Sequence, residues 1–394
     1  MITIKAPAIY VNEPGIITRT GNYVSRYGKR GLIIAGKRAL ASIKGQLFFS
    51  LRSSGMEYQT LILEGAPTER KAEEFLRRIS ASDTDFVIGA GGGRVCDFAK
   101  LIGNKLKKPI VMIPTIAATC ACWAARSVLY QEDATFDHIQ WNEESPECIL
   151  ADTDILLHAP KRYLASGIMD TYAKWYEFYP LLKNRPDDLV LLQGVASAKM
   201  AFEILNRYES KAITGTLLPA EEEKVVDAIF YLAGVIGSFE NGHINRGLAH
   251  AFYYAAVQIP ESHHLLHGEL VAFGLLVQLV LRESLIPRNS SDTGNCNNAV
   301  LLQKLTGDLL ALGITETPYD WNLENKEKTI REISRYILAK TPSLQQNGFT
   351  YNPDTIEQAI HEASRFLIRQ RGKVQNGETG NTGRNQRTAC VQSV

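Results

Sequence analysis

Short apolar runs alternate with amphipathic segments through the first 150 residues of the chain. Four apolar runs rich in β-branched residues and leucine predict strands: residues 31–36, 58–65, 85–93 and 108–115. Residues 68–81 and 94–107, which separate some of these runs, have the apolar spacing of helices. Because apolar strands alternate with helices, the pattern predicts an α/β fold whose parallel sheet is covered on both faces.

The pattern becomes helical after about residue 160. The longest helical segments are residues 163–182, 188–208, 269–285 and 355–370, and we predict no strand among them. We therefore expect an α/β domain over residues 1–160 and an all-α domain over residues 161–370. Residues 371–394 are polar and rich in glycine, asparagine and glutamine, which predicts a disordered tail.

The composition and charge of the chain disfavour several classes of partner and cellular location. The 394 residues carry a formal net charge of +1, so bulk charge gives no support to nucleic-acid or membrane-surface binding. The first residues lack the pattern of a signal peptide, and the longest apolar run, residues 270–281, is shorter than the roughly 20 residues that span a bilayer. Six scattered cysteines indicate free thiols in a reducing compartment. We expect a cytoplasmic protein that acts on a small molecule, without a nucleic-acid or membrane partner.

A glycine-rich turn lies between a predicted strand and a predicted helix. Gly89 and the run Gly91, Gly92 and Gly93 leave the backbone bare where the next helix begins. Backbone N–H groups and a helix N-terminus together favour an anion, and a pyrophosphate fits this place. The motif is not the G-x-G-x-x-G fingerprint, because residue 94 is an arginine. A tight turn with no ligand is the alternative interpretation.

The end of the strand at residues 31–36 indicates which dinucleotide is preferred. NAD sites of this type place an acidic residue there to hold the ribose 2′-hydroxyl. Here Gly36 is followed by Lys37 and Arg38, which would attract a 2′-phosphate. We therefore expect NADP(H) to be favoured over NAD(H). The alternative is that the two cations lie on a solvent-exposed helix start and bind no ligand.

Five of the eight histidines fall between residues 243 and 267, which suggests a metal site or a general acid. His250 lies in a helical pattern, and His267 precedes an apolar helix that Gly268 allows to begin sharply. Asp170 lies in an apolar and aromatic segment, where an unpaired charge would be costly. One carboxylate and two imidazoles leave a coordination position open for substrate and suit Zn²⁺ or Fe²⁺. A role for Asp170 in the first turn of a helix is the alternative.

Several ordered motifs together resemble the iron-containing alcohol dehydrogenase superfamily. They read GAGGGRVCDFAK, PTIAATCACWAARSVLY, GIMDTYAKWYE, AHAFYY and HHLLHGELVAFGLLVQLVL. The similarity extends to about residue 370 and belongs to the glycerol dehydrogenase-like branch, within which the chain is most similar to the NADPH-linked hydroxycarboxylate dehydrogenases. The resemblance implies a Rossmann-like dinucleotide-binding domain, a helical metal- and substrate-binding domain, and a homo-oligomer.

The resemblance also implies roles for individual residues. It places the metal ligands and the catalytic centre on Asp170, His250 and His267. Together with the strand-end argument, it gives the cofactor positions Gly36, Lys37, Gly91, Gly92, Gly93, Asp97, Thr115, Thr119 and Tyr130. The candidate substrate residues are Cys120, Arg126 and Lys174.

Departures from the family pattern refine the expected substrate and metal. Cys120 replaces an aspartate that contacts polyols in glycerol dehydrogenases, which disfavours glycerol. Lys174 replaces the fourth ligand, a histidine, of the iron enzymes, so Zn²⁺ is favoured over Fe²⁺. Arg126 stands where leucine is common and, like Lys174, is a candidate cation for a carboxylate. We therefore expect a metal-dependent NAD(P)-linked dehydrogenase for a 2-hydroxy acid and its 2-oxo acid.

Three alternatives remain open at this stage. One is a glycerol or other polyol dehydrogenase. A second is a cyclase of the related dehydroquinate synthase-like class, which would need more basic residues for a phosphate. The third is a nucleotide-binding sensor without turnover, for which the changed histidine motif, with Tyr253 in place of a histidine, is the support.

Overall fold

The computed structural model describes residues 2–79, 81–239, 247–285, 298–341 and 351–376. The chain divides into two compact units. The first comprises the described residues up to 239 together with residues 266–268, and the second comprises the remaining described residues. The secondary structure changes from mixed to helical near residue 160, as predicted, but the first unit continues beyond this point through several helices.

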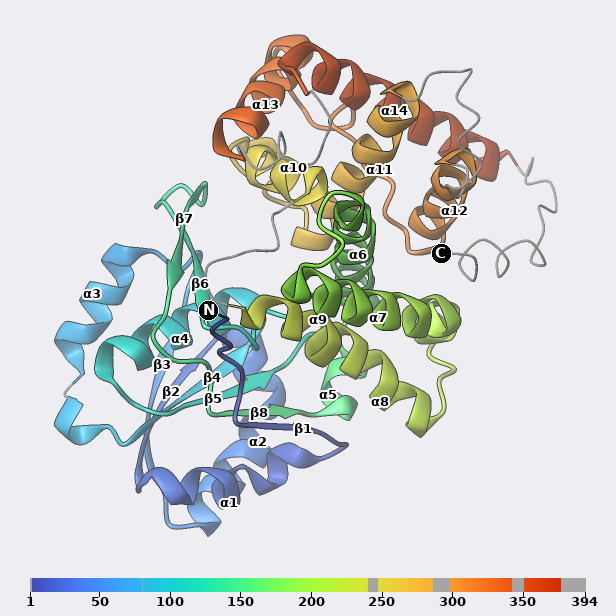
Figure 1. The fold of residues 1–394 in the computed structure, drawn as a ribbon. Coiled ribbons are helices and arrows are strands. Elements are labelled where there is room, and N and C mark those ends of the chain that lie inside the picture. Colours follow the sequence, from blue (N-terminus) through green and yellow to red (C-terminus); the bar gives the residue numbers. More distant parts are fainter. Residues whose placement is uncertain (1, 80, 240–246, 286–297, 342–350, 377–394) are drawn as a thin grey trace. The chain divides into compact units, whose positions relative to one another are not determined.

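A six-stranded parallel sheet forms the centre of the first unit (Figure 1). Its strands, in chain order, are β1 (Ile9–Asn12), β2 (Arg30–Ala35), β3 (Glu57–Ile62), β4 (Phe86–Gly91), β5 (Ile110–Pro114) and β8 (Cys148–Ala151). The four predicted strands are β2 to β5, so the expected α/β fold with a parallel sheet is confirmed. The sequence pattern did not predict β1, β8 or the antiparallel hairpin of β6 (Arg126–Tyr130) and β7 (Phe136–Trp141).

The strand order is β1-β8-β5-β4-β2-β3. Strand β2, the second strand along the chain, therefore lies in the interior of the sheet between β4 and β3. From β2 the chain moves to β3 on one side, and then returns to β4 on the other side of β2. Open parallel sheets bind ligands where the connections diverge in this way, outside the carboxyl ends of the strands. The carboxyl ends of β2 and β4 are therefore the expected place for a dinucleotide.

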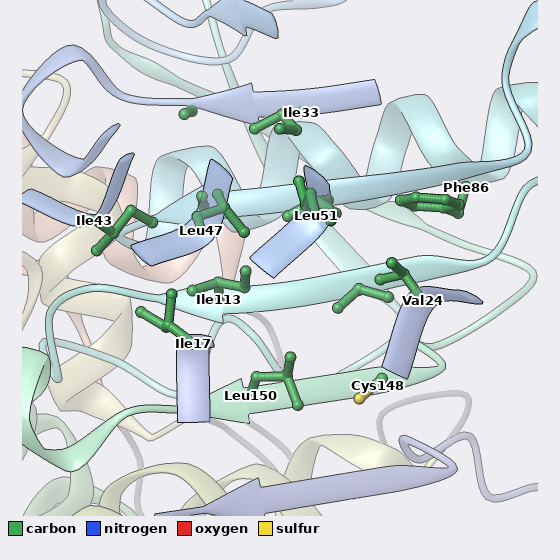
Figure 2. Close-up of a cluster of buried hydrophobic side chains, with 14 of the residues drawn as sticks. Ile17, Val24, Ile33, Ile43, Leu47, Leu51, Phe86, Ile113, Cys148 and Leu150 are labelled. Atoms are coloured by element: carbon green, nitrogen blue, oxygen red, sulfur yellow. The ribbon is translucent and has the colours of Figure 1, made fainter. Parts of the chain in front are cut away.

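Helices cover both faces of the sheet. On one face, α1 (Thr20–Val24) and α2 (Lys37–Ser53) pack on alternate residues of the strands, and Figure 2 shows Leu47 and Leu51 of α2 among these side chains. On the other face, α4 (Gly93–Leu106) packs so closely on β4 that a Cβ atom at Gly89 would lie 2.6 Å from the Cβ of Ala99. Gly89 thus serves helix packing, which corrects the expectation that it exposes backbone to an anion.

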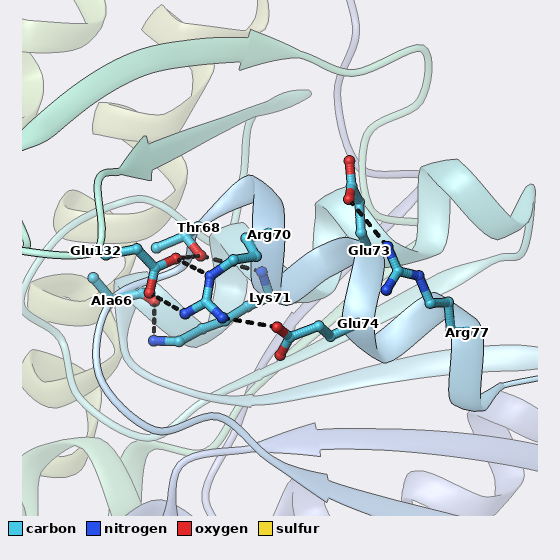
Figure 3. A network of polar contacts seen from close by, with 8 residues as sticks. All are labelled: Ala66, Thr68, Arg70, Lys71, Glu73, Glu74, Arg77 and Glu132. Carbon is cyan, nitrogen blue, oxygen red and sulfur yellow. Dashed lines mark hydrogen bonds and ion pairs between the residues drawn. The ribbon is translucent and has the colours of Figure 1, made fainter.

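A polar network joins the β6–β7 hairpin to α3 (Glu69–Arg78), as Figure 3 shows. Thr68 begins this helix by accepting a hydrogen bond from the amide of Lys71. The carboxylate of Glu132 in the hairpin turn accepts from Thr68 Oγ1 at 2.8 Å and from Arg70 Nη2 at 2.6 Å. These groups hold the pKa of Glu132 at about 2, below its usual value, because Arg70 and Thr68 stabilise the ionised form.

The remaining helices of the first unit follow the sheet in sequence. They are α5 (Thr153–His158), α6 (Lys161–Phe178), α7 (Leu189–Thr214), α8 (Pro219–Asp227) and α9 (Ala233–Val235). Helix α6 is buried on almost every side, and α7 packs along it through residues such as Phe202. By length and composition alone α7 could cross a membrane, but core helices of soluble proteins pass the same test, so this is weak evidence for a membrane span.

The described part of the second unit is helical. Its helices are α10 (Leu248–Ala256), α11 (His267–Leu285), α12 (Asn298–Ala311), α13 (Lys326–Lys340) and α14 (Pro353–Gln375), and the first two residues of α11 group with the first unit. The predicted helical character after residue 160 is confirmed, since no named strand follows β8 among the described residues. Residues 371–375, which we expected in a disordered tail, belong to α14, and residues 377–394 lie outside the described residues.

Candidate active site

The glycine-rich turn stands at the carboxyl end of β4. Gly92 is the N-cap of α4 and no side chain caps the helix, so backbone N–H groups of its first turn face outward without a side-chain acceptor. A Cβ atom at Gly92 would lie 2.5 Å from Ile116 Cδ1, and one at Gly93 would lie 3.1 Å from Thr119 Oγ1. Gly92 and Gly93 therefore allow the segment after β5 to lie directly against the start of α4.

Other predicted cofactor residues gather around this turn. The amide of Thr115 donates to the carbonyl of Gly91 at 3.2 Å, which joins the ends of β4 and β5. The ring of Tyr130 lies 5.6 Å from the guanidinium carbon of Arg94 in the first turn of α4. The structure thus brings residues 91–93, Thr115, Thr119 and Tyr130 together, at the end of the sheet where a dinucleotide is expected.

The β2–α2 turn lies beside the glycine-rich turn. The amide of Gly36, the N-cap of α2, reaches the carbonyl of Ala90 in β4 at 3.4 Å. Lys37 and Arg38 begin α2 with exposed side chains. Their charges are therefore available to an anion next to the turn between β2 and α2.

Asp97 is the predicted cofactor residue whose surroundings differ most from expectation. Its side chain is buried inside the first unit and pairs with the ammonium group of Lys100 at 3.0 Å. Burial raises the pKa of Asp97 above its usual value, although the charge of Lys100 opposes the shift. In the structure Asp97 thus belongs to an internal polar network, and a direct contact with a cofactor stays a prediction.

A carboxylate and an imidazole face each other on α6 and at the start of α11. Asp170 Oδ1 lies 3.3 Å from His267 Nε2, and Asp170 is only 3% exposed. Asp170 stands in the middle of α6, so the alternative that it serves the first turn of a helix is wrong. The two ligand atoms are close enough to bind one cation.

Two glycines bring this pair together. A Cβ atom at Gly167 would lie 2.0 Å from the carbonyl oxygen of Ala117, and one at Gly268 would lie 1.8 Å from the carbonyl oxygen of Ser166. The amide of Gly268 also donates to Ser166 Oγ at 3.0 Å. Helix α6 therefore makes backbone contact both with the segment that borders the glycine-rich turn and with the start of α11. The sequence predicted that His267 precedes the helix and that Gly268 allows a sharp entry, but α11 begins at His267, and Gly268 instead allows the close approach to Ser166.

Lys174 is paired with Asp170 one helical turn away. Its Nζ atom lies 3.0 Å from Asp170 Oδ2 and donates to the backbone carbonyl of Asp170 at 2.9 Å. Burial by itself would lower the pKa of Lys174, but the Asp170 carboxylate and the nearby Cys120 raise it above its usual value. Arg126 is also near enough to influence this pKa. Cys120 and Arg126 thus lie near Lys174, which is itself paired with Asp170.

The five clustered histidines have different surroundings. His263 bonds through Nε2 to the carbonyl of Val257, and His264 pairs with Glu316 at 2.8 Å. His243 lies outside the described residues, and His250 lies partly buried on α10 in the second unit. Local contacts therefore account for His263 and His264, and leave His250 and His267 as the candidates for metal binding.

Two features of the site were not predicted. The pairing of Asp170 with Lys174 has a sequence signal, since residues four apart on a helix share a face. The burial of Lys100 could also have been predicted from the sequence. Lys100 lies three residues after Asp97, on the same apolar face of the helix.

Comparison with known proteins gives a consistent result. Residues 7–153 match the family described as iron-containing alcohol dehydrogenase. A glycerol dehydrogenase from Thermotoga maritima is 32% identical over 70% of this chain and 76% of its own length. Hydroxycarboxylate dehydrogenase A from Escherichia coli is 28% identical over 92% of this chain and 97% of its own. The crystal structure of glycerol dehydrogenase from Schizosaccharomyces pombe is 25% identical, covers 96% of this chain and 93% of its own, and superposes with a TM-score of 0.80.

Proposed function

The chain belongs to the iron-containing alcohol dehydrogenase family, and we propose that it is a metal-dependent oxidoreductase linking NADP(H) to a 2-hydroxy acid and its 2-oxo acid. One observation carries the proposal: the buried carboxylate of Asp170 faces His267, and α6 is in backbone contact with the segment that borders the glycine-rich turn. A metal-ligating pair and an anion-binding turn are thus joined within a single unit.

The donor atoms fit a divalent transition metal. Asp170 Oδ1 and His267 Nε2 are an oxygen and a nitrogen ligand, the combination that Zn²⁺ and Fe²⁺ accept. His250 of the second unit supplies the third ligand in this proposal. Lys174 holds Asp170 Oδ2 and cannot itself ligate while protonated, which supports a three-ligand site and favours Zn²⁺ over Fe²⁺.

The glycine-rich turn fits a dinucleotide. The N-terminal amides of α4, at Gly92 and Gly93, receive the pyrophosphate, and Gly91 lets the chain turn there. Thr115, Thr119 and Tyr130 line the nicotinamide side. Gly36 and Lys37 border the ribose, where the exposed cations Lys37 and Arg38 favour a 2′-phosphate. When bound, the metal supplies Lewis acidity and the nicotinamide carries the hydride.

Arg126 is the cation that binds the substrate carboxylate in this proposal. Bringing a carboxylate into a closed site without a partner costs several kcal/mol, so a cation is required. Lys174 is committed to Asp170 through both its carboxylate and its backbone carbonyl, whereas Arg126 lies nearby with its side chain partly exposed. This difference supports Arg126 over Lys174 as the anchor, and Cys120, near Lys174, offers no carboxylate for a polyol.

Substrate selectivity tests the proposal. Pyruvate and hydroxyacetone have the same three-carbon skeleton, but pyruvate has a carboxylate where hydroxyacetone has a hydroxymethyl group. We expect NADPH oxidation with a higher kcat/KM for pyruvate, and we expect Arg126→Leu to lose this preference by raising KM for pyruvate alone. Equal values for the two substrates in the unaltered enzyme would overturn the oxo-acid assignment.

A polyol dehydrogenase is the second candidate, because several similar proteins are glycerol dehydrogenases. Oxidation of glycerol exceeding that of 2-hydroxy acids would favour it. Cofactor binding without any turnover would instead favour a nucleotide-binding sensor. In each case we expect a cytoplasmic homo-oligomer with no nucleic-acid or membrane partner.

A further inference from the structure

Lys100 is a buried cation on α4 whose three N–H donors all have partners. It is 1% exposed and pairs with Asp97 at 3.0 Å. Its Nζ atom also donates to the carbonyl of Ala124 at 3.1 Å and to the carbonyl of Arg126. An ammonium group has three donors, so these contacts use its full capacity. Lys100 therefore binds the backbone on both sides of Ala125, immediately before and at the start of β6.

Further hydrogen bonds hold the same stretch of backbone. Ser127 Oγ donates to the carbonyl of Asp97 at 2.7 Å and accepts from Asn142 Nδ2 at 3.0 Å. The amide of Asn142 donates to the carbonyl of Ala125 at 3.0 Å. The start of β6 is thus attached to α4 on one side and to the end of β7 on the other.

The Arg126 side chain occupies space beside Gly237. A Cβ atom at Gly237 would lie 3.3 Å from Arg126 Nη2 and 3.1 Å from the Cβ of Ala124. A larger residue at position 237 would crowd the guanidinium group, so Gly237 leaves the room that this side chain occupies. The backbone of Arg126 is thus held by Lys100, and its guanidinium group lies close to Gly237.

We propose that Lys100 is a positioning residue, which fixes the backbone of Ala124 and Arg126 and thereby directs Arg126 toward the substrate carboxylate. The inference rests on the proposed function, in which Arg126 binds that carboxylate. A structural role alone does not need a charge, because a buried ion pair is often no more stabilising than apolar residues of similar volume. Because Lys100 lies on the helix whose N-terminus receives the pyrophosphate, the same helix sets the position of cofactor and substrate anchor.

The test compares selectivity rather than activity alone. The double variant Asp97→Asn with Lys100→Met removes both buried charges and keeps similar side-chain volumes. We expect the ratio of KM for pyruvate to KM for hydroxyacetone to rise about tenfold or more, because a displaced binding group loses its aligned contacts, whereas a change in cofactor binding alone would leave this ratio unchanged. The milder Ser127→Ala, which removes one hydroxyl, should give an intermediate rise if the double variant fails to fold. Lys105→Met is the matched control, since Lys105 lies on the same helix and pairs with Glu69 near the surface.

One binding measurement and one hydrogen-exchange measurement complete the test. The dissociation constant of oxamate, measured by calorimetry in the presence of NADP⁺, should rise in parallel with KM for pyruvate, and hydrogen exchange of residues 124–130 should become faster. If the double variant and Ser127→Ala keep the selectivity of the parent enzyme while Arg126→Leu loses it, Lys100 does not position Arg126. If Arg126→Leu itself leaves selectivity unchanged, the proposed anchor is wrong and the inference falls with it.

Discussion

The carboxylate of Asp170 and the imidazole of His267 lie 3.3 Å apart although 97 positions separate them in the sequence. The contact depends on two glycines, since a side chain at Gly167 or Gly268 would collide with the backbone of a neighbouring segment. An acidic residue kept buried by tight backbone packing, and facing a partly exposed histidine, is an arrangement suited to ligation. Its chemical role can be tested separately from the packing that creates it.

Gly268→Ala tests the packing. The new Cβ atom would lie 1.8 Å from the carbonyl oxygen of Ser166, so α11 and α6 must separate. We expect the free energy of unfolding to fall by about 1–3 kcal/mol, the usual cost of overpacking, together with weaker metal binding. Urea denaturation and a zinc titration measure the two effects.

Gly372→Ala is the matched control for Gly268→Ala. Gly372 lies in the helix α14 with open space around its Cα atom, so alanine should leave metal binding unchanged and raise stability by about 0.5–1 kcal/mol. If both alanine variants behave alike, the close contact between α6 and α11 does not hold the site.

Replacing the cationic side chains of Lys37 and Arg38, which follow β2, tests the preference for NADP(H) over NAD(H). In the double variant Lys37→Ser with Arg38→Ser, kcat/KM for NADPH should fall about tenfold, as expected when a charge-assisted hydrogen bond to a phosphate is lost. The value for NADH should change by less than about twofold, because the 2′-hydroxyl carries no charge. Lys44→Ser, also exposed on α2, is the control and should alter neither value. A parallel loss with both cofactors would argue against a bound 2′-phosphate.

The pKa of Glu132 predicts a pH dependence of stability. In the folded protein this pKa is lowered from 4.5 to about 2 by Arg70 and Thr68, so the ionised carboxylate stabilises the fold. That contribution is complete above the unfolded-state pKa, and it is lost as the pH falls through the folded-state pKa. Glu132→Gln should therefore have a lower melting temperature than the parent at pH 7, and the difference should shrink as the pH falls from 4.5 toward about 2.

Glu73→Gln provides the comparison for Glu132→Gln. Glu73 forms an exposed ion pair with Arg77 at 3.6 Å, and both residues lie on α3. Exposed ion pairs of this kind contribute little to stability. Its melting temperature should follow that of the parent at every pH. A pH-independent loss in Glu132→Gln would show that the network stabilises α3 by packing instead of charge.

The predicted and missed strands differ in a physical way. Strands β2, β4 and β5 are mostly apolar, buried runs of five or six residues, and β3 ends in apolar residues, so the strand pattern of all four was clear. Strands β1 and β8 have only four residues each, and β1 is partly exposed. The β6–β7 turn gave no hairpin signal, because its positive φ of 67° belongs to Ala134 instead of a glycine or asparagine.

The candidate site could be predicted only where a residue stood out from its local sequence. Asp170 stood out as a charge in an apolar segment, and the structure confirms that it is buried and partnered. The histidine cluster was less informative, because sequence proximity does not give side-chain direction, and His263 and His264 have local partners. The packing role of Gly89 requires knowledge of the helix that covers β4, which only the folded chain provides.

The central claim is that Asp170, His250 and His267 hold one catalytic metal ion, and elemental analysis of the purified protein tests it most directly. We expect one divalent ion for each chain, its loss together with dehydrogenase activity in Asp170→Asn, His250→Ala and His267→Ala, and its retention in Asp154→Asn, whose carboxylate is exposed on α5. Full activity after exhaustive chelation, or unchanged metal content in the three ligand variants, would contradict the account.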